Sequence, residues 1–103
     1  MSSLSPDSVA VAVREQLASQ GEEGISVLNL KTGTYYALDR VGSRVWELVQ
    51  NPRRIQEILE HLLEEFDVEA EECETDLRVL LQEMAIAGLV EVTDPTIKKG
   101  IPR

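Results

Sequence analysis

The sequence has a single cysteine, Cys73, and few of the residue patterns that mark catalytic or metal sites. One cysteine cannot form an internal disulfide, and its place in a helical pattern indicates a small buried side chain in a reducing, cytoplasmic environment. No HExxH, no CxxC pair and no Gly-rich phosphate loop occurs, and the lone His61 has no second ligand at a suitable spacing. We therefore expect no catalytic residue, no cofactor and no metal site.

Long apolar runs are missing as well. No apolar segment approaches the roughly 18 residues of a membrane-spanning helix, and the amino-terminal MSSLSPDS lacks the basic region and apolar core of a signal peptide. We expect a soluble chain with no membrane partner. A length of 103 residues allows one small domain with a modest core. We place this domain at residues 1–92 and expect a poorly ordered tail over 93–103.

Basic side chains are scarce. Ten Lys and Arg residues stand against 19 acidic ones, and the formal net charge is -9. The segment from Ile55 to Asp76 contains many carboxylates and no Lys or Arg. Such a surface repels phosphate backbones, which argues against a nucleic-acid partner. The plain interpretation is a solvated helix surface that keeps the protein soluble, and the functional alternative is steering of a basic partner segment.

The first 40 residues contain three β-strand patterns. Val9, Val11 and Val13 alternate with small or charged residues, which predicts a strand over about 8–16. The segment ASQGEEG is typical of a solvated turn and leads to a second strand, ISVLNL. A tight Lys-Thr-Gly turn then leads to a third strand, TYYAL. Short links between consecutive strands predict an antiparallel meander.

Three helices are predicted after these strands. Asp39 can cap the first helix, which a QNP segment ends near Asn51. The second helix carries a continuous apolar stripe over 55–66. The third runs over about 70–87 with Gly88 as its C-terminal stop, and the LVEV segment after it is expected to be extended. The predicted fold class is α+β, a three-stranded antiparallel meander followed by three helices.

The run from Ile25 to Val92 resembles the PqqD family and the related RiPP recognition elements. Its first part, VLNLKTGTYYALDRVGSRVW, is similar to the family's apolar strand, Gly turn, aromatic strand ending in Leu-Asp, and helix with an apolar-Trp pair. Its second part, ILEHLLEEFDVEAEECETDLRVLLQEMAIAGLVEV, resembles the family's helix, acidic link, third helix and terminal Gly-Leu turn. The sequence departs from the family at DRVGSRVW, where Thr and small residues are more usual, and this affects the helix start more than the aromatic strand.

The resemblance implies binding of the leader segment of a ribosomally made precursor peptide. The leader would be presented to a separate leader peptidase or to another maturation enzyme. A free-standing chain of this size is similar to the leader-binding half of the split B protein in lasso peptide biosynthesis. PqqD itself and discrete recognition proteins beside radical enzymes are close alternatives.

The third strand supports peptide binding on physical grounds. In a meander one side of this strand is paired, and its other edge carries free N–H and C=O groups. TYYAL has no Lys, Pro or bulge to protect that edge, so an extended peptide can add as a fourth strand. We expect Leu38 to be largely core and the two tyrosines to be divided between packing and a pocket, although β-propensity alone also explains the tyrosines. The candidate peptide-binding residues lie on this strand and on one flank of the third helix: Thr34, Tyr35, Tyr36, Ala37, Leu38, Asp76, Val79, Leu80 and Glu83.

Two other functions stay open from the sequence. Three helices and a hairpin also describe a winged helix-turn-helix regulator, whose third helix would enter the major groove of DNA. That helix has one Arg and no Lys, whereas helices that bind nucleic acid show a basic stripe. The other possibility is a structural subunit without a peptide ligand.

Overall fold

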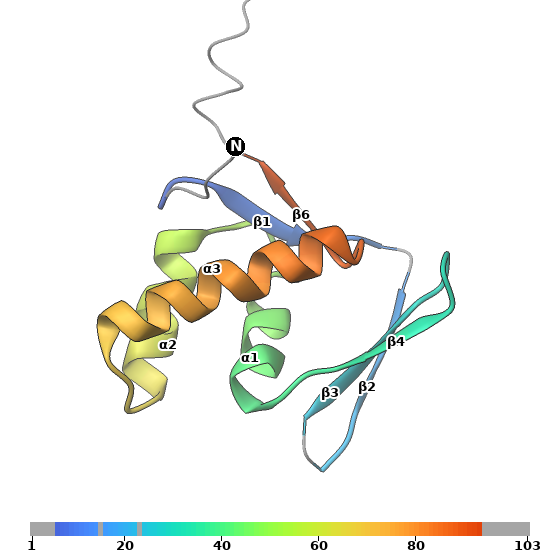
Figure 1. The fold of residues 1–103 in the computed structure, drawn as a ribbon, viewed down its shortest axis with the longest axis horizontal. Coiled ribbons are helices and arrows are strands. Elements are labelled where there is room, and N and C mark those ends of the chain that lie inside the picture. The colour runs from blue at the N-terminus through green and yellow to red at the C-terminus, as the bar shows by residue number, and fades with distance from the viewer. Residues whose placement is uncertain (1–5, 15, 23, 94–103) are drawn as a thin grey trace, which may run out of the picture.

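The computed structural model describes residues 6–14, 16–22 and 24–93, which form an α+β fold (Figure 1). The strands make two three-stranded sheets, with orders β5-β1-β6 and β2-β3-β4. In chain order the elements are β1 Val9–Ala12, β2 Gln16–Gln20, β3 Ile25–Asn29, β4 Thr34–Ala37, α1 Arg40–Leu48, β5 Arg53–Arg54, α2 Ile55–Glu65, α3 Ala70–Ile86 and β6 Val90–Thr93. The predicted fold class and the three-stranded meander, β2-β3-β4, are confirmed. Residues 94–103, where a tail was expected, lie outside the described residues.

The predicted start of the meander is wrong. Its first strand is β2, which pairs with β3 from Gln16 opposite Asn29 to Gln20 opposite Ile25. Part of the segment predicted as a turn is therefore strand. The valine alternation belongs instead to β1, which pairs with β5 and β6 in the other sheet. Local alternation could not reveal this, because the partners of β1 come from much later in the chain.

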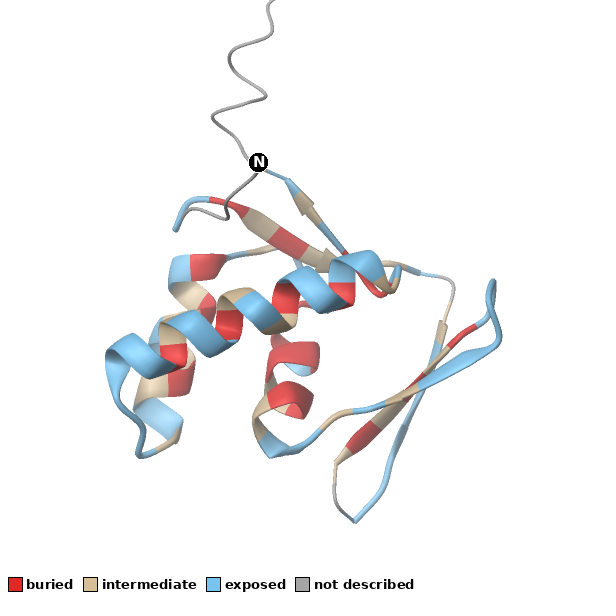
Figure 2. Cartoon of the chain, viewed as in Figure 1, coloured by how far each residue is buried: buried red, intermediate tan, exposed pale blue. Residues whose placement is uncertain are grey.

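The helices and the inner face of the meander share one core. The helix stripes seen in the sequence are buried, with Ile58 and Leu62 on α2 and Leu77 and Leu81 on α3. Val27 of β3 is also completely buried in this core. Figure 2 shows buried segments facing the space between the helices, and exposed segments on the outside of α3 and of the meander.

The helix ends follow local sequence signals. The Asp39 carboxylate accepts a hydrogen bond from the Gly42 N–H at 2.8 Å and caps α1 as predicted. That helix ends at Leu48, earlier than the QNP segment suggested. Gly88 has φ +80° just after α3, a conformation that favours glycine and ends the helix. In the part of the chain that the structure describes, no helix has the length and apolar character needed to cross a membrane.

Two buried polar side chains fix the meander to the helices. The Ser43 hydroxyl on α1 accepts a hydrogen bond from the Ile25 N–H at 2.8 Å and donates to the Leu38 carbonyl at 3.2 Å. At the other end of the meander, the Asn29 side-chain amide donates to the Ala87 carbonyl, 2.9 Å away, just beyond α3. These bonds hold both ends of β3, and they set the position of its neighbour β4 relative to α1 and α3.

Candidate functional site

β4 is an edge strand of the meander. It pairs with β3 from Ser26 opposite Ala37 to Asn29 opposite Thr34, and it is the last strand in the sheet order. Figure 1 shows β4 running directly into α1, with the meander standing to one side of the helices. A free strand edge therefore lies beside the helical part of the molecule, as the sequence predicted.

The register shows which groups face this edge. The Leu38 N–H donates to the Ile25 carbonyl at 2.8 Å, which marks these two residues as a hydrogen-bonded pair. Bonded and non-bonded pairs alternate in an antiparallel ladder, so Tyr36 is also bonded to β3. The backbone groups of Tyr35 and Ala37 consequently point to the free edge. Only these two residues of β4 offer both an N–H and a C=O to an added strand.

The side chains of β4 divide between two faces. Tyr36 and Leu38 are half-buried and pack against the core. Thr34 and Ala37 are exposed, and Tyr35 keeps 65% of its surface accessible. The two tyrosines thus lie on opposite faces, as alternation predicted, and Leu38 contacts the core without being fully covered.

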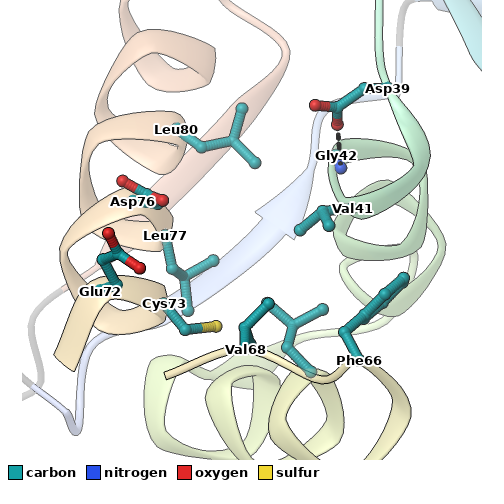
Figure 3. A pocket seen from close by; sticks show the side chains of 11 residues that line it. Asp39, Val41, Gly42, Phe66, Val68, Glu72, Cys73, Asp76, Leu77 and Leu80 are labelled. Carbon is teal, nitrogen blue, oxygen red and sulfur yellow. Dashed lines mark hydrogen bonds between the residues drawn. The ribbon is translucent and has the colours of Figure 1, made fainter. Parts of the chain in front are cut away.

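A pocket of about 330 Å³ opens beside the end of β4 (Figure 3). Its walls come from the start of α1, from the end of α2 with the following link, and from one flank of α3. Asp39, the residue after Leu38 and the N-cap of α1, is one of the lining residues. The lining residues are Asp39, Val41, Gly42, Leu62, Phe66, Val68, Glu72, Cys73, Asp76, Leu77 and Leu80.

The structure brings some of the predicted helix residues to this pocket and not others. Asp76 and Leu80 line it, and Figure 3 shows both on the α3 wall facing the start of α1. Val79 and Glu83 are exposed on α3 and are not among the lining residues. The opposite wall, formed in part by Phe66, was missed. The available signal was the FDV link between the second and third helices, in which Phe66 ends the stripe of the second helix and Val68 belongs to neither helical stripe.

An ion pair joins two elements that carry the pocket walls. The Arg44 guanidinium on α1 donates to both carboxylate oxygens of Glu65 on α2, at 2.7 and 2.9 Å. These bonds hold the pKa of the Glu65 carboxyl below its ordinary value. A lowered pKa means that the pair stabilises the fold at neutral pH and loses this effect as the pH falls into the acid range. Both side chains are about one-third exposed, so the contribution is small.

Residues 24–90 match the model for coenzyme PQQ synthesis protein D (PqqD). The chain belongs to the PqqD family. The matched range extends from the start of β3 to the start of β6, so it contains β4, all three helices and the pocket.

Two solved structures resemble this PqqD-family chain. The first is TbiB1 in complex with the TbiA(beta) leader peptide, with 33% sequence identity and a TM-score of 0.72, covering 79% of this chain and 94% of that one. The second is lasso peptide synthetase B1 complexed with the leader peptide, with 18% identity and a TM-score of 0.70, covering 80% and 96%. The second likeness concerns the fold alone. A search of curated proteins found no match.

The lone histidine and the lone cysteine of the sequence lie on different helices. His61 is on α2, with its Nδ1 atom 3.9 Å from the Glu65 carboxylate. Cys73 is a buried free thiol on α3 and lines the pocket. Within the described residues, no group of three or more His, Cys, Asp and Glu side chains could hold a metal ion.

Cys73 provides a chemical probe of the pocket. Burial raises the pKa of its thiol, and the negative charge of Asp76 raises it further. Since the thiolate is the reactive form, we expect iodoacetamide to alkylate the folded protein at neutral pH at least about tenfold more slowly than the urea-unfolded protein. A ligand that fills the pocket should slow the reaction again, and Cys73→Ala should still bind that ligand. Alkylation as fast in the folded protein as in urea, or no effect of a bound ligand, would contradict this.

Proposed function

We propose that this chain binds the leader segment of a ribosomally made precursor peptide and presents it to a separate leader peptidase or other maturation enzyme, in lasso peptide biosynthesis. Membership of the PqqD family and the likeness to TbiB1, whose structure contains a leader peptide, support the proposal. The observation that carries it is the free edge of β4 next to an apolar pocket with acidic residues in its walls.

The β4 edge supplies the main-chain part of this binding. A leader in extended conformation pairs with the backbone groups of Tyr35 and Ala37 and becomes a fourth strand of the meander. Successive side chains of the added strand point to opposite faces of the sheet. One set faces the helices, where a side chain just beyond Leu38 reaches the pocket, and the other set faces outward beside Tyr35.

The pocket supplies the side-chain part. Val41, Leu77 and Leu80 give it apolar walls that suit an aliphatic or aromatic side chain. The carboxylates of Glu72 and Asp76 are exposed on the α3 wall, and Glu83 follows along the same helix. This arrangement favours a leader in which Lys or Arg accompanies an apolar residue. Each exposed charge contributes little and is screened by salt.

Binding of DNA is less well supported by the same helix. The one basic residue of α3, Arg78, donates a hydrogen bond to Glu74 at 2.8 Å, so its charge is already paired. The exposed side of α3 also carries Glu72 and Glu83, which would repel phosphates in a major groove. No basic stripe therefore lies on the helix that a winged helix-turn-helix protein would insert.

A titration tests the proposal against its alternatives. We expect calorimetry with a synthetic leader from the neighbouring precursor gene to show one peptide bound per chain, and a scrambled peptide of the same composition to bind far more weakly. A basic leader should lose affinity as the salt concentration rises, because salt screens its attraction to a chain of net charge -9. Tight binding of duplex DNA at about 0.15 M salt without peptide binding would contradict the proposal and indicate a winged helix-turn-helix regulator. Absence of both would indicate a structural subunit.

A further inference from the structure

The face of the meander that points away from the helices carries a row of large apolar side chains. Directly opposite residues in an antiparallel sheet share a face, and the register sets Leu17, Leu28 and Tyr35 in one row across the three strands. Leu17 is 60% exposed and Tyr35 is 65% exposed, whereas Leu28 between them is half-buried. We call this row, together with the next one, the outer face.

The second row of the outer face has only small side chains. It consists of Ser19, Ser26 and Ala37, again paired directly across the strands. Among the described residues of β2, β3 and β4, none on the outer face is charged, although the whole chain carries a net charge of -9. Exposed apolar side chains that gather on one uncharged face are typical of sites of protein association.

We propose that the outer face docks the maturation enzyme that acts on the peptide held at β4, through an apolar and uncharged patch on that enzyme. This inference rests on the proposed function. A leader strand added at β4 continues both rows, because its outward side chains lie next to Tyr35 and Ala37. The outer face of the loaded sheet is then formed jointly by the chain and the peptide, so an enzyme docked there contacts both.

A second copy of the chain fits this face less well. Packing two outer faces together would bring two chains of net charge -9 into contact, and their repulsion opposes association. A dimer formed in this way would also cover the outward side chains of the leader, which a processing enzyme must approach. An enzyme that binds the joint surface of chain and leader avoids the repulsion between two identical acidic chains, and it contacts the leader side chains directly.

Joint contact has a thermodynamic consequence. If the enzyme touches the chain and the leader together, the leader raises the affinity of the chain for the enzyme. By linkage, the enzyme raises the affinity of the chain for the leader by the same factor. Presentation of the leader can then be measured as the coupling free energy between binding of the leader and binding of the enzyme.

The test changes Leu17, because β2 is the meander strand farthest from the β4 edge. Leu17→Lys is compared with Ile86→Lys, which makes a similar apolar-to-Lys change at an 87% exposed position near the end of α3. We expect both variants to bind the synthetic leader within about twofold of the unmodified chain. Affinity of the leader-loaded chain for the peptidase encoded beside the precursor should fall about tenfold or more in Leu17→Lys alone.

The outcomes separate this inference from the proposed function. If the unmodified chain binds no leader, the proposed function fails and the inference fails with it. If leader binding is intact but Leu17→Lys binds the peptidase as well as Ile86→Lys does, only the docking surface is wrong. Sedimentation that shows a dimer of the unmodified chain, dissociated by Leu17→Lys, would assign the face to a second copy and overturn the inference. Leu17→Thr keeps a strand-forming residue and should show the same loss if Leu17→Lys unfolds.

Discussion

Replacing Ala37 with proline is expected to lower the affinity for the leader by at least about tenfold while the protein stays folded. The Ala37 N–H points to the free edge of β4 and is not needed for pairing with β3. Proline removes this donor, and its ring occupies space that an added strand requires. A main-chain hydrogen bond is worth about 0.5–1.5 kcal/mol, and steric exclusion of the peptide adds to its loss. Fluorescence polarisation with a labelled leader measures the change, and a thermal melt monitors folding.

Ala37→Ser is the matched control, because it keeps the N–H and adds only a small hydroxyl to the outer face. Its affinity should stay within about twofold of the unmodified chain. Hydrogen exchange gives an independent readout at the same edge. The amides of Tyr35 and Ala37 should become protected when the leader binds, whereas those of Tyr36 and Leu38 should be protected already. Normal binding by Ala37→Pro, or protection confined to α2, would place the leader elsewhere.

The β4 edge could be predicted because its signals are local. The turn before Thr34, the alternation along Tyr35 and Tyr36, and the absence of Lys or Pro are all visible in a few consecutive residues. The Asp39 cap is equally local, since its carboxylate reaches the Gly42 N–H within the same turn. Local signals thus fixed the strand, its two faces and the start of the helix that follows.

The sheet containing β1 could not be predicted in the same way. β5 is only two residues long, and β6 joins β1 from the other end of the described chain. Pairing over such distances depends on how the helices between the strands pack, and no window of sequence contains it. The valine alternation near Val9 was therefore a correct strand signal that was assigned to the wrong sheet.

The pocket shows a similar limit. Its walls come from three helices and the link after α2, and the sequence predicted only the α3 wall. Helical spacing put Asp76, Val79 and Leu80 on one flank of α3. Val79 and Leu80 differ by one residue in direction around the helix, and this difference decides that only Leu80 reaches the pocket. Asn29 was also overlooked. A polar residue buried at the end of a strand indicates a specific partner, which here is the Ala87 carbonyl.

The neighbouring pair Leu80 and Val79 distinguishes a leader that enters the pocket from one that only crosses the helix surface. Leu80 is half-buried and lines the pocket, whereas Val79 is 48% exposed and does not. We expect Leu80→Gln to lower leader affinity by about tenfold, since burying a Leu side chain against a ligand is worth about 1.5–3 kcal/mol when complete. Val79→Gln should change the affinity by no more than about threefold, because a side chain outside the pocket stays in contact with water when the leader binds.

Glutamine is chosen because it leaves the net charge unchanged and favours the helix, so neither electrostatic steering nor the stability of α3 confuses the comparison. Leu80→Met conserves volume and apolar character and should restore most of the affinity, which separates loss of the pocket wall from a general disturbance of the core. Calorimetry gives the affinities, and urea unfolding gives the stability of each variant. Equal losses for Leu80→Gln and Val79→Gln would mean that the leader lies over the exposed side of α3. Unchanged affinity in Leu80→Gln would mean that the peptide is held by the β4 edge without using the pocket.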